Sequence, residues 1–320
     1  MAPARIYRSK KISKVNTVSG AISSSAMGRT RIHEHLLWIW PGTESDPFSE
    51  FNEENTSKSV TQTVLAIKKR GVSTLVDATP INLSRRIEFL KQVADATEMN
   101  IIAATGFSDA KHLPFYFDRM NIDRLADIME YEITKGIGDT GIKAGVIKVG
   151  TGDTVAESEE KILRAAAQVS KRTGVPVISH TEHGTLGIEQ IDILESEGID
   201  LSRVVIGHTC TSSDIAYYLD IIERGAYAGF DRIGWNEYQR NEVRLVAVTG
   251  LIGAGYTDRM ILSQDSLMAV AEAPHLPAPQ GENRWTYLED EFIPRLLNAG
   301  IKSESIEQVL VHNPRCIFEG

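Results

Sequence analysis

The 320-residue chain has few cysteines and no long hydrophobic run. No apolar stretch approaches the roughly 20 residues of a membrane span, so we expect no membrane anchor. Cys210 and Cys316 are the only two cysteines, too few for a disulfide framework, which favours a reducing compartment and a cytoplasmic location. The basic start of the chain has no apolar stretch behind it, which argues against a secretory signal.

Positive charge is also scarce. The chain has 34 Lys and Arg against 43 Asp and Glu, which gives a formal net charge of −9. No block of basic residues offers a surface for a phosphate backbone, so we expect no nucleic-acid partner. The hydrophobic fraction is 42% and the charged fraction 24%. This is the composition of an ordinary globular protein and excludes a mainly disordered chain.

Short apolar runs rich in β-branched residues alternate with longer amphipathic stretches. Eight runs are predicted as strands, at residues 29–37, 73–79, 100–106, 144–150, 175–181, 203–209, 226–231 and 259–265. The stretches that follow them are predicted as helices, at residues 55–70, 84–98, 121–137, 155–173, 187–198, 213–224, 239–253 and 285–299, with a short helix at 303–310. Eight strand–helix units predict an α/β fold, a parallel (β/α)8 TIM barrel.

A doubly wound open sheet is the alternative to a barrel. That fold usually carries a glycine-rich phosphate loop after its first strand, and neither GxGxxG nor a Walker sequence follows any predicted strand. We therefore predict a single barrel domain at residues 29–320, preceded by an N-terminal extension with a short β hairpin at residues 1–28. The loop at residues 266–284 is long and proline-rich, which is typical of a functional loop.

Titratable side chains gather where the predicted strands end. Four histidines and one aspartate stand there: His33, His35, His180, His208 and Asp265. The active site of a barrel lies at the C-terminal ends of its strands. The spacing of His33 and His35 turns both imidazoles to one side of a strand and Glu34 to the other, which is a metal-ligand spacing. Because four imidazoles and a carboxylate have little structural use in a barrel mouth, we predict a metal site.

Two basic residues also occupy strands of the predicted barrel. Lys148 lies in the otherwise apolar fourth strand, where burial would lower its pKa and leave a neutral amine that can act as a nucleophile, form a Schiff base or add CO2. A lysine that faces outward beneath a helix is the alternative. Arg232 follows the seventh strand, where it either steers ligands or pairs with Asp231 or another carboxylate.

Five motifs resemble those of one known family. IHEHL, IKVG, SHT, IGHT and SQD, at the ends of the first, fourth, fifth, sixth and eighth strands, are similar in sequence and order to the phosphotriesterase family of the amidohydrolase superfamily. The resemblance covers nearly the whole chain, and GFDRIGW at residues 229–235 resembles the lactonase-like branch in particular. It implies a TIM barrel with a binuclear metal centre.

The resemblance implies six metal-ligating side chains, of which three hold the more buried ion, two hold the more exposed ion and one bridges both. In that order they are His33, His35 and Asp265, then His180 and His208, then Lys148. The lysine would carry a CO2-derived carbamate and bridge the ions together with a hydroxide. Zn is the expected metal, with Co, Mn or Fe as alternatives.

The resemblance further implies a hydrolase of lactones or esters with promiscuous phosphotriesterase activity. Asp265 and Arg232 would be its catalytic residues: the first takes the proton of the attacking hydroxide, and the second steers ligands or the leaving group. The alternatives are a dedicated phosphotriesterase or carboxylesterase and, in another class, a non-catalytic ligand-binding relative. We favour the enzyme because all six ligand positions are kept. Relatives suggest a homodimer that takes small-molecule lactones, esters or organophosphates.

One loop departs from the family pattern. Many lactonases of the family carry a tyrosine after the third strand, where this chain has Phe107, Ser108 and Asp109. Elsewhere, Asp77 ends the second strand and is expected to orient a metal-bound histidine as a hydrogen-bond acceptor. His183 is expected at the rim of the pocket. Three further histidines are expected in solvent: His112, His275 and His312.

Overall fold

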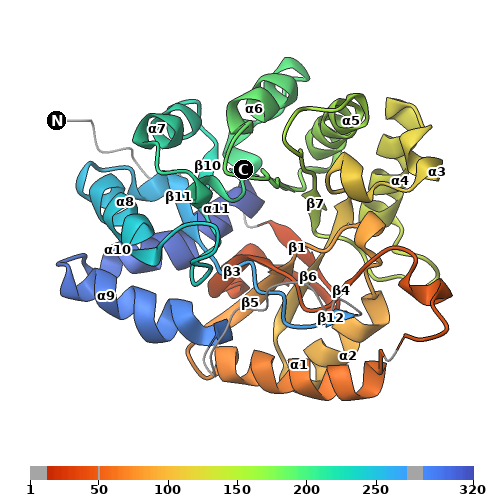
Figure 1. The fold of residues 1–320 in the computed structure, drawn as a ribbon, viewed down its shortest axis with the longest axis horizontal. Helices are drawn as coiled ribbons and strands as arrows, with labels where there is room; N and C mark the ends of the chain where they lie inside the picture. Colours follow the sequence, from red (N-terminus) through yellow and green to blue (C-terminus); the bar gives the residue numbers. More distant parts are fainter. Residues whose placement is uncertain (1–12, 50, 272–283) are drawn as a thin grey trace.

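The computed structural model describes residues 13–49, 51–271 and 284–320. Its centre is a sheet of eight parallel strands in the order β11-β10-β9-β8-β7-β6-β5-β3. In chain order they are β3 Arg29–Glu34, β5 Val72–Asp77, β6 Asn100–Gly106, β7 Val146–Lys148, β8 Val177–Ile178, β9 Val204–Ile206, β10 Tyr227–Phe230 and β11 Met260–Leu262. Figure 1 shows the helices ranged around these strands, so the predicted (β/α)8 barrel is confirmed.

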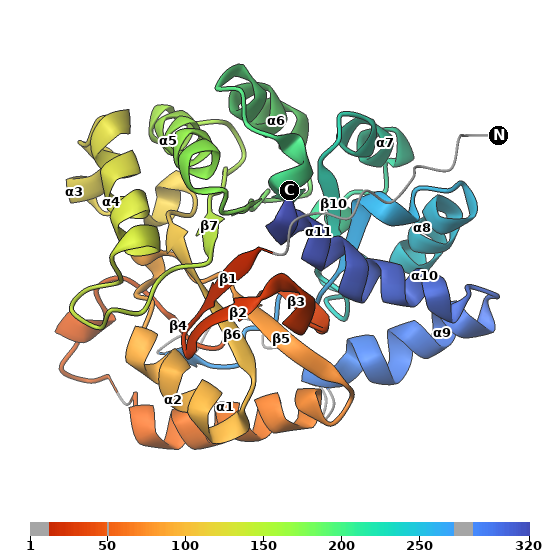
Figure 2. The same ribbon diagram turned by 180° about the vertical axis from the view of Figure 1, so that it is seen from behind.

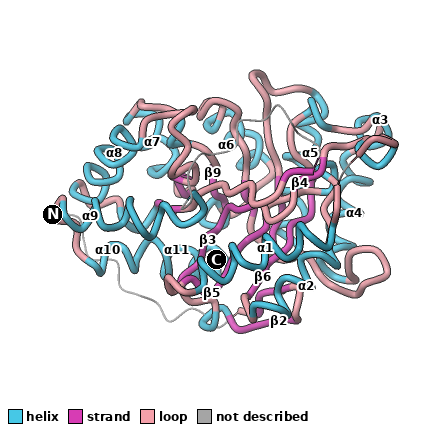
Figure 3. Tube along the Cα trace, turned by 60° about the horizontal axis from the view of Figure 1, so that its bottom comes forward, coloured by secondary structure: helices cyan, strands magenta, loops and turns pink. Residues whose placement is uncertain are grey.

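Helices cover the outside of the barrel, as Figure 3 shows from the side. They are α1 Glu53–Lys68, α2 Ile87–Thr97, α3 Phe115–Asp118, α4 Ile122–Thr134, α5 Glu157–Thr173, α6 Gly187–Ser196, α7 Ile215–Glu223, α8 Asn241–Gly253, α9 Ile293–Asn298, α10 Ser303–Glu307 and α11 Asn313–Glu319. Among the described residues, every helix is too short or too polar to cross a membrane.

Two apolar layers stabilise the barrel. The inner layer consists of fully buried strand residues such as Ile32, Val76, Ile102, Val146 and Ile261. The outer layer lies between the strands and the helices. Both layers follow from the pleat of a strand, which sends successive side chains to opposite faces, one toward the barrel axis and the other toward the helices.

The two ends of the barrel are closed by different elements. At the N-terminal end, the hairpin of β1 (Lys14–Thr17) and β2 (Gly20–Ser23) and helix α11 lie across the strands, as Figure 2 shows. Val15 and Phe318 from these elements join the inner apolar layer. At the C-terminal end, the loops include a short parallel pair, β4 (Trp38–Ile39) and β12 (Val270–Ala271).

The first and last barrel strands, β3 and β11, are the two ends of the hydrogen-bonded strand order. Hydrogen bonds from a side chain and from backbone amides join the C-terminal ends of these two strands. Ser263 Oγ lies 3.1 Å from the carbonyl oxygen of His33 and 2.6 Å from Glu34 Oε1. The amide of Asp265 donates to the same His33 carbonyl at 3.0 Å. The barrel is thus closed by contacts that involve the candidate site residues themselves.

All eight predicted strands occur, but most end before the predicted boundary. β8 ends at Ile178, β9 at Ile206 and β11 at Leu262, so the candidate ligands after them stand in loops just beyond the strands: His180, His208 and Asp265. In a loop, successive side chains need not point to opposite faces as they do in a strand. Two of these residues use that freedom, since His208 has φ +59° and Asp265 has φ +50°, both in the left-handed region.

The C-terminal helices differ from the prediction. The helix predicted at 285–299 begins with a 3-10 turn, Arg284–Thr286, and a π-helical turn, Leu288–Phe292, before α9. The helix predicted to end at 310 continues through a second π-helical turn, Gln308–His312, into α11. The first helix is therefore present, with irregular turns at its start, whereas the end predicted at residue 310 was wrong. Each π turn stands just before a proline in the next helix, Pro294 or Pro314, whose missing N–H cannot complete an α-helical bond.

Candidate metal centre

Four imidazoles meet at the C-terminal mouth of the barrel. The ring of His33 lies 5.6 Å from that of His35 and 4.7 Å from that of His208, measured between centroids. His208 in turn lies 4.6 Å from His180, with its Nε2 3.0 Å from His180 Nδ1. Residues that are up to 175 positions apart in the sequence therefore form one cluster, because the C-terminal ends of the parallel barrel strands meet in one mouth.

Each of these imidazoles has one ring nitrogen held by a protein oxygen. The pairs are His33 Nδ1 with Asp231 Oδ2 at 2.7 Å, His208 Nδ1 with Asp231 Oδ1 at 3.0 Å, His35 Nδ1 with Thr79 Oγ1 at 2.8 Å and His180 Nε2 with Glu182 Oε2 at 3.0 Å. Such partners fix the orientation of a ring and its tautomer, and leave the other nitrogen available to a metal.

The remaining nitrogens of three rings face the carboxylate of Asp265. His35 Nε2 lies 3.4 Å and His33 Nε2 3.8 Å from Oδ1, and His208 Nε2 lies 3.7 Å from Oδ2. Burial alone would raise the pKa of Asp265, but the charges and hydrogen bonds of the neighbouring histidines and Arg232 hold it well below its usual range. Asp265 therefore stands ionised at the centre of the cluster.

Lys148 is the sixth member of the cluster. Its side chain is buried in the barrel mouth, with Nζ 2.5 Å from His33 Nε2, and does not lie beneath a helix. Burial lowers its pKa to about 8. A neutral amine is thus more accessible here than on a lysine in water.

Burial also favours the uncharged form of three of the histidines, His33, His180 and His208. It lowers the pKa of His33 to about 4, with a further lowering by the nearby Lys148. The pKa of His180 is lowered as well, and that of His208 falls far below its usual value, again mainly through burial. Neutral imidazole is the form that ligates metals. With the ligand atoms of His33, His208 and Asp265 within 4.8 Å of one another, the donor set fits divalent transition metals.

Arg232 borders this cluster. Its Nε donates to Asp265 Oδ2 at 3.1 Å, its Nη1 donates to the Glu182 carbonyl at 3.3 Å, and its guanidinium stacks on the ring of Tyr238 at 4.0 Å. The sequence left two roles open for Arg232, a ligand-steering role and an ion pair with Asp231 or another carboxylate. The ion pair is observed, and its partner is Asp265. The side chain also lines the open cavity beside the cluster.

Sequence reasoning missed the partners of the histidines. Asp77, expected to accept from a histidine, instead accepts from the amides of Leu36 at 2.7 Å and Thr79 at 3.1 Å. Asp77 thus positions Thr79, and Thr79 contacts His35. Asp231 was considered only as a partner of Arg232. Its place at the end of a barrel strand was the available signal, the same one that identified the histidines.

A cavity of about 350 Å³ opens beside the cluster. Its walls include the side chains of Trp38, Trp40, Trp235, Tyr238 and Leu267 on the apolar side. Leu267 brings the start of the 266–284 loop, which the sequence predicts to be functional, to this cavity. The expectation for His275 falls on residues 272–283, which lie outside the described part of the chain.

Charged groups form another wall of the same cavity. Ligand atoms of Asp109, His180 and Glu182 lie within 4.8 Å of one another. The hydrogen bond from His180 lowers the pKa of Glu182 to about 2. Burial opposes ionisation of Asp109, yet contact with His112 lowers the pKa of its carboxyl to about 2. The wall therefore carries two ionised carboxylates, which the sequence did not predict.

The other histidines occupy different environments. His112 was expected in solvent, but it lines the cavity, with Nδ1 2.8 Å from Asp109 Oδ1, so that prediction was wrong. The side chain of His183 is 65% exposed and lies 3.3 Å from Asp153. His312 is exposed, as expected.

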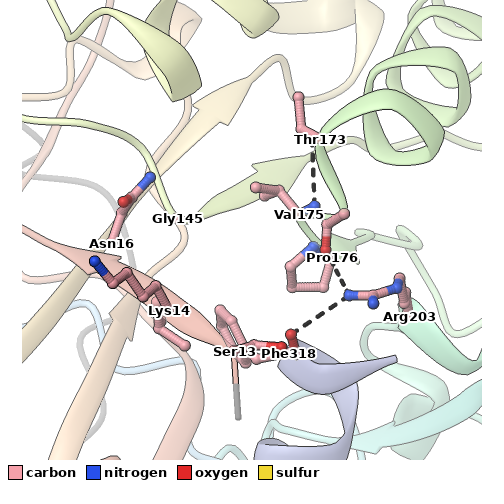
Figure 4. Close-up of a pocket in the computed structure, with 11 residues that line it drawn as sticks. Ser13, Lys14, Asn16, Gly145, Thr173, Val175, Pro176, Arg203 and Phe318 are labelled. Carbon is pink, nitrogen blue, oxygen red and sulfur yellow. Dashed lines mark hydrogen bonds between the residues drawn. The ribbon is translucent and has the colours of Figure 1, made fainter. Parts of the chain in front are cut away.

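A second cavity, of about 200 Å³, lies at the N-terminal end of the barrel (Figure 4). Polar side chains line it too, but they are bonded to the backbone. Arg203 Nη1 donates to the carbonyls of Gly174 at 2.5 Å and Phe318 at 3.4 Å. Asn16 Nδ2 donates to the carbonyl of Ala144 at 2.9 Å. These side chains stabilise the backbone around the cavity. Their polar atoms point to separate carbonyls and not to a common point inside it.

Comparison with known proteins agrees with this geometry. The model of the phosphotriesterase family matches residues 13–318. The aryldialkylphosphatase of Saccharolobus solfataricus is 33% identical over 304 residues, which cover 93% of this chain and 97% of that protein. The organophosphorus hydrolase of Deinococcus radiodurans superposes with a TM-score of 0.90 at 34% identity, over 99% of this chain and 100% of that one. A mutant of a PTE-like lactonase from the same organism gives a TM-score of 0.88 at 36% identity. This match covers 95% of this chain and 99% of that one.

Proposed function

Because the chain belongs to the phosphotriesterase family and is a hydrolytic enzyme, we propose that it uses two metal ions to hydrolyse lactones or esters, and phosphotriesters more slowly. The observation that carries the proposal is the orientation of the four imidazoles. Asp231, Thr79 and Glu182 hold one nitrogen of each ring. The other nitrogens gather with Asp265 and Lys148 in the mouth of the barrel.

We assign five of the six side chains to two ions that would share the mouth. His33 and His35 would hold one ion together with Asp265, whose Oδ1 is the oxygen that both rings approach. His180 and His208 would hold the other, since their free nitrogens lie 3.0 Å apart. When bound, two divalent ions would lower the pKa of water toward neutrality and polarise the carbonyl or phosphoryl oxygen of the substrate. We propose zinc as the metal.

Lys148 would bridge the two groups as a carbamate. Its ammonium would first lose one proton to water. The neutral amine would then attack the carbon of CO2, a nitrogen–carbon bond would form, and the nitrogen would release a second proton to water, so that a cation becomes an anion. The lowered pKa of the amine supports this step, since more of it is uncharged near neutral pH. The carbamate's negative charge would offset the repulsion between two cations in one mouth.

Asp265 and Arg232 would be the two catalytic residues beside the metal ligands. The ionised carboxylate of Asp265 accepts the proton of the attacking water, a role for which its position among the histidines suits it. Arg232 touches this carboxylate at 3.1 Å and lines the cavity, so it would orient the substrate or the leaving group.

The substrate preference rests on the cavity. Its indole rings and Leu267 suit an apolar acyl or ring substituent. The relatives support the same chemistry, since one is described as a lactonase and another as an aryldialkylphosphatase. We propose small-molecule lactones or esters as the main substrates. A homodimer and a cytoplasmic location complete the proposal.

The test is elemental analysis of metal-reconstituted protein combined with a substrate panel. We expect about two ions per chain and a higher kcat/KM for lactones or aryl esters than for paraoxon-type triesters under one metal condition. His208→Ala should lose metal, and the matched control His183→Ala, an exposed histidine, should keep it. Less than about half an ion per chain would contradict the two-metal site. A triester preferred more than about tenfold would contradict the lactonase assignment alone.

A further inference from the structure

The backbone at Asp265 adopts a conformation that few residues adopt alone. Its φ is +50°, in the left-handed region. A non-glycine residue persists there only when the surrounding structure holds it. The residues that must do so are those of the turn 263–266, which we call the Asp265 turn.

The carboxylate of Glu34 encloses this turn. Its Oε1 accepts the amide of Gln264 and its Oε2 accepts the amide of Ser266, each at 3.0 Å. These two amides flank Asp265 on either side. The hydroxyl of Ser263 is a third donor to this carboxylate, and its oxygen lies 2.6 Å from Oε1. Glu34, Ser263 and Ser266 are fully buried, so water does not compete for these bonds.

The residues on each side of Glu34 bind the same turn through their backbone. The amide of Asp265 donates to the carbonyl of His33 at 3.0 Å, and the amide of His35 donates to the carbonyl of Ser266 at 2.8 Å. The histidines and Asp265 are thus connected through the backbone that Glu34 holds. Any shift of the turn would change the distances between the Nε2 atoms of both histidines and the Asp265 carboxylate.

Glu34 has a cationic neighbour. Arg31 lies beside it, with Nη1 3.8 Å from Glu34 Oε2, and forms a two-pronged ion pair with Glu289. The side chains of Arg31 and Glu34 are wholly buried. A carboxylate with a cationic neighbour has two oxygens that can accept from several donors at once.

We propose that Glu34 is a positioning residue: it holds the Asp265 turn in its left-handed conformation and so sets the affinity of the mouth for metal. The inference rests on the proposed function for its second part, the metal affinity. A carboxylate is required because the amides of Gln264 and Ser266 each need an acceptor oxygen. An amide side chain offers one acceptor oxygen, and its NH2 group would face one of the two amides.

The test compares Glu34→Gln with the matched control Glu132→Gln. Glu132 forms a buried ion pair with Arg85 at 2.8 Å, in which the side chains are 13% and 6% exposed, away from the cavity. The first readout is hydrogen exchange of the 260–266 segment in metal-free protein. Glu34→Gln should exchange at least about tenfold faster there, whereas Glu132→Gln should match the wild type. The second readout is zinc affinity by chelator competition, which should fall about tenfold or more only in Glu34→Gln.

Exchange and zinc affinity both within twofold of the wild type would overturn the proposal. If Glu34→Gln does not fold, Trp235→Phe replaces it, because Trp235 Nε1 donates to the Gln264 carbonyl of the same turn at 2.7 Å. It should give a smaller change in both readouts, and no change would count against the proposal. A wild type that takes up no zinc would contradict the proposed function, while the exchange readout would still decide the role of Glu34.

Discussion

The two cavities at opposite ends of the barrel are built on the same strands but use polar side chains differently. At the N-terminal end, Arg203 and Asn16 donate to backbone carbonyls. At the C-terminal end, imidazole and carboxylate groups face one another across the opening. Groups satisfied by backbone stabilise the fold, whereas groups that converge on one point form a ligand site. The direction of the polar atoms separates the two cavities more clearly than their volume does.

The two ends also differ in charge chemistry. Burial lowers the pKa of His33 to about 4 and of Lys148 to about 8 at the C-terminal end. The described residues that line the N-terminal cavity contain neither histidine nor carboxylate. Substitutions at the C-terminal end should therefore change hydrolysis, metal binding and pH dependence, and those at the N-terminal end should change stability alone.

The largest effect is expected from Lys148→Ala. Without the bridging anion, two cations would face each other in the mouth, so kcat/KM should fall by roughly two to three orders of magnitude. Steady-state kinetics and metal content measure this. A short-chain carboxylic acid added in trans should restore part of the rate by occupying the vacated position. A variant with unchanged rate and metal content would show that the lysine is structural.

Asp231→Asn should have the next largest effect. One carboxylate oxygen holds His33 and the other holds His208, and an amide offers only one acceptor oxygen for the two rings. Metal affinity should fall by about 10- to 100-fold, as measured by chelator competition. Asp192→Asn, which alters an exposed ion pair with Arg224, is the control and should keep the wild-type affinity. Equal metal affinities in the two variants would show that Asp231 does not contribute to metal binding.

Acid should destabilise the metal-free protein through the C-terminal end. His33 has a pKa of about 4 when folded against 6.5 ordinarily, so between these pH values the unfolded chain binds a proton that the folded chain does not. The free energy of unfolding should therefore fall as pH falls. His33 alone contributes about 2 kcal/mol between pH 7.5 and pH 5, and His180 and His208 shift in the same direction. Urea unfolding at several pH values measures the slope, and a flat profile would contradict the buried neutral histidines.

The smallest effect is expected from Arg203→Met in the N-terminal cavity. The variant loses hydrogen bonds to the carbonyls of Gly174, Phe318 and Glu319. The free energy of unfolding should fall by about 1–2 kcal/mol, because backbone acceptors lose a charged donor. Metal content and kcat/KM should stay within twofold of the wild type, and the acid slope should persist. A loss of hydrolysis would mean that the two ends are coupled.

The barrel and its histidines could be predicted because their signals are local. Runs of β-branched residues mark the strands, and the spacing of His33 and His35 gives a shared side within three residues of chain. Asp231 and Glu34 could not be assigned in this way. Asp231 lies 198 positions from His33, and Glu34 lies 232 positions from the amide of Ser266. Their roles exist only once the barrel has closed.

The helix that was predicted to end at residue 310 continues to Glu319 for a different physical reason. Proline is a sound local signal for the end of a helix. Here Val309 and Leu310, both fully buried, precede Pro314. Packing these side chains on the barrel favours continuation of the helix, and the π turn accommodates the missing proline N–H. The burial of these side chains depends on the folded barrel, so the local sequence did not reveal that the helix continues.

The left-handed backbone at His208 and Asp265 has an evolutionary consequence. Both positions would accommodate glycine with less conformational strain than the residues they carry. Selection for folding alone would therefore not retain these side chains. In a lineage released from the need for hydrolysis, drift should replace these two residues early, while the apolar layers of the barrel persist. The identity of the residue at positions 208 and 265 is thus a marker by which active and decayed descendants of this fold can be told apart.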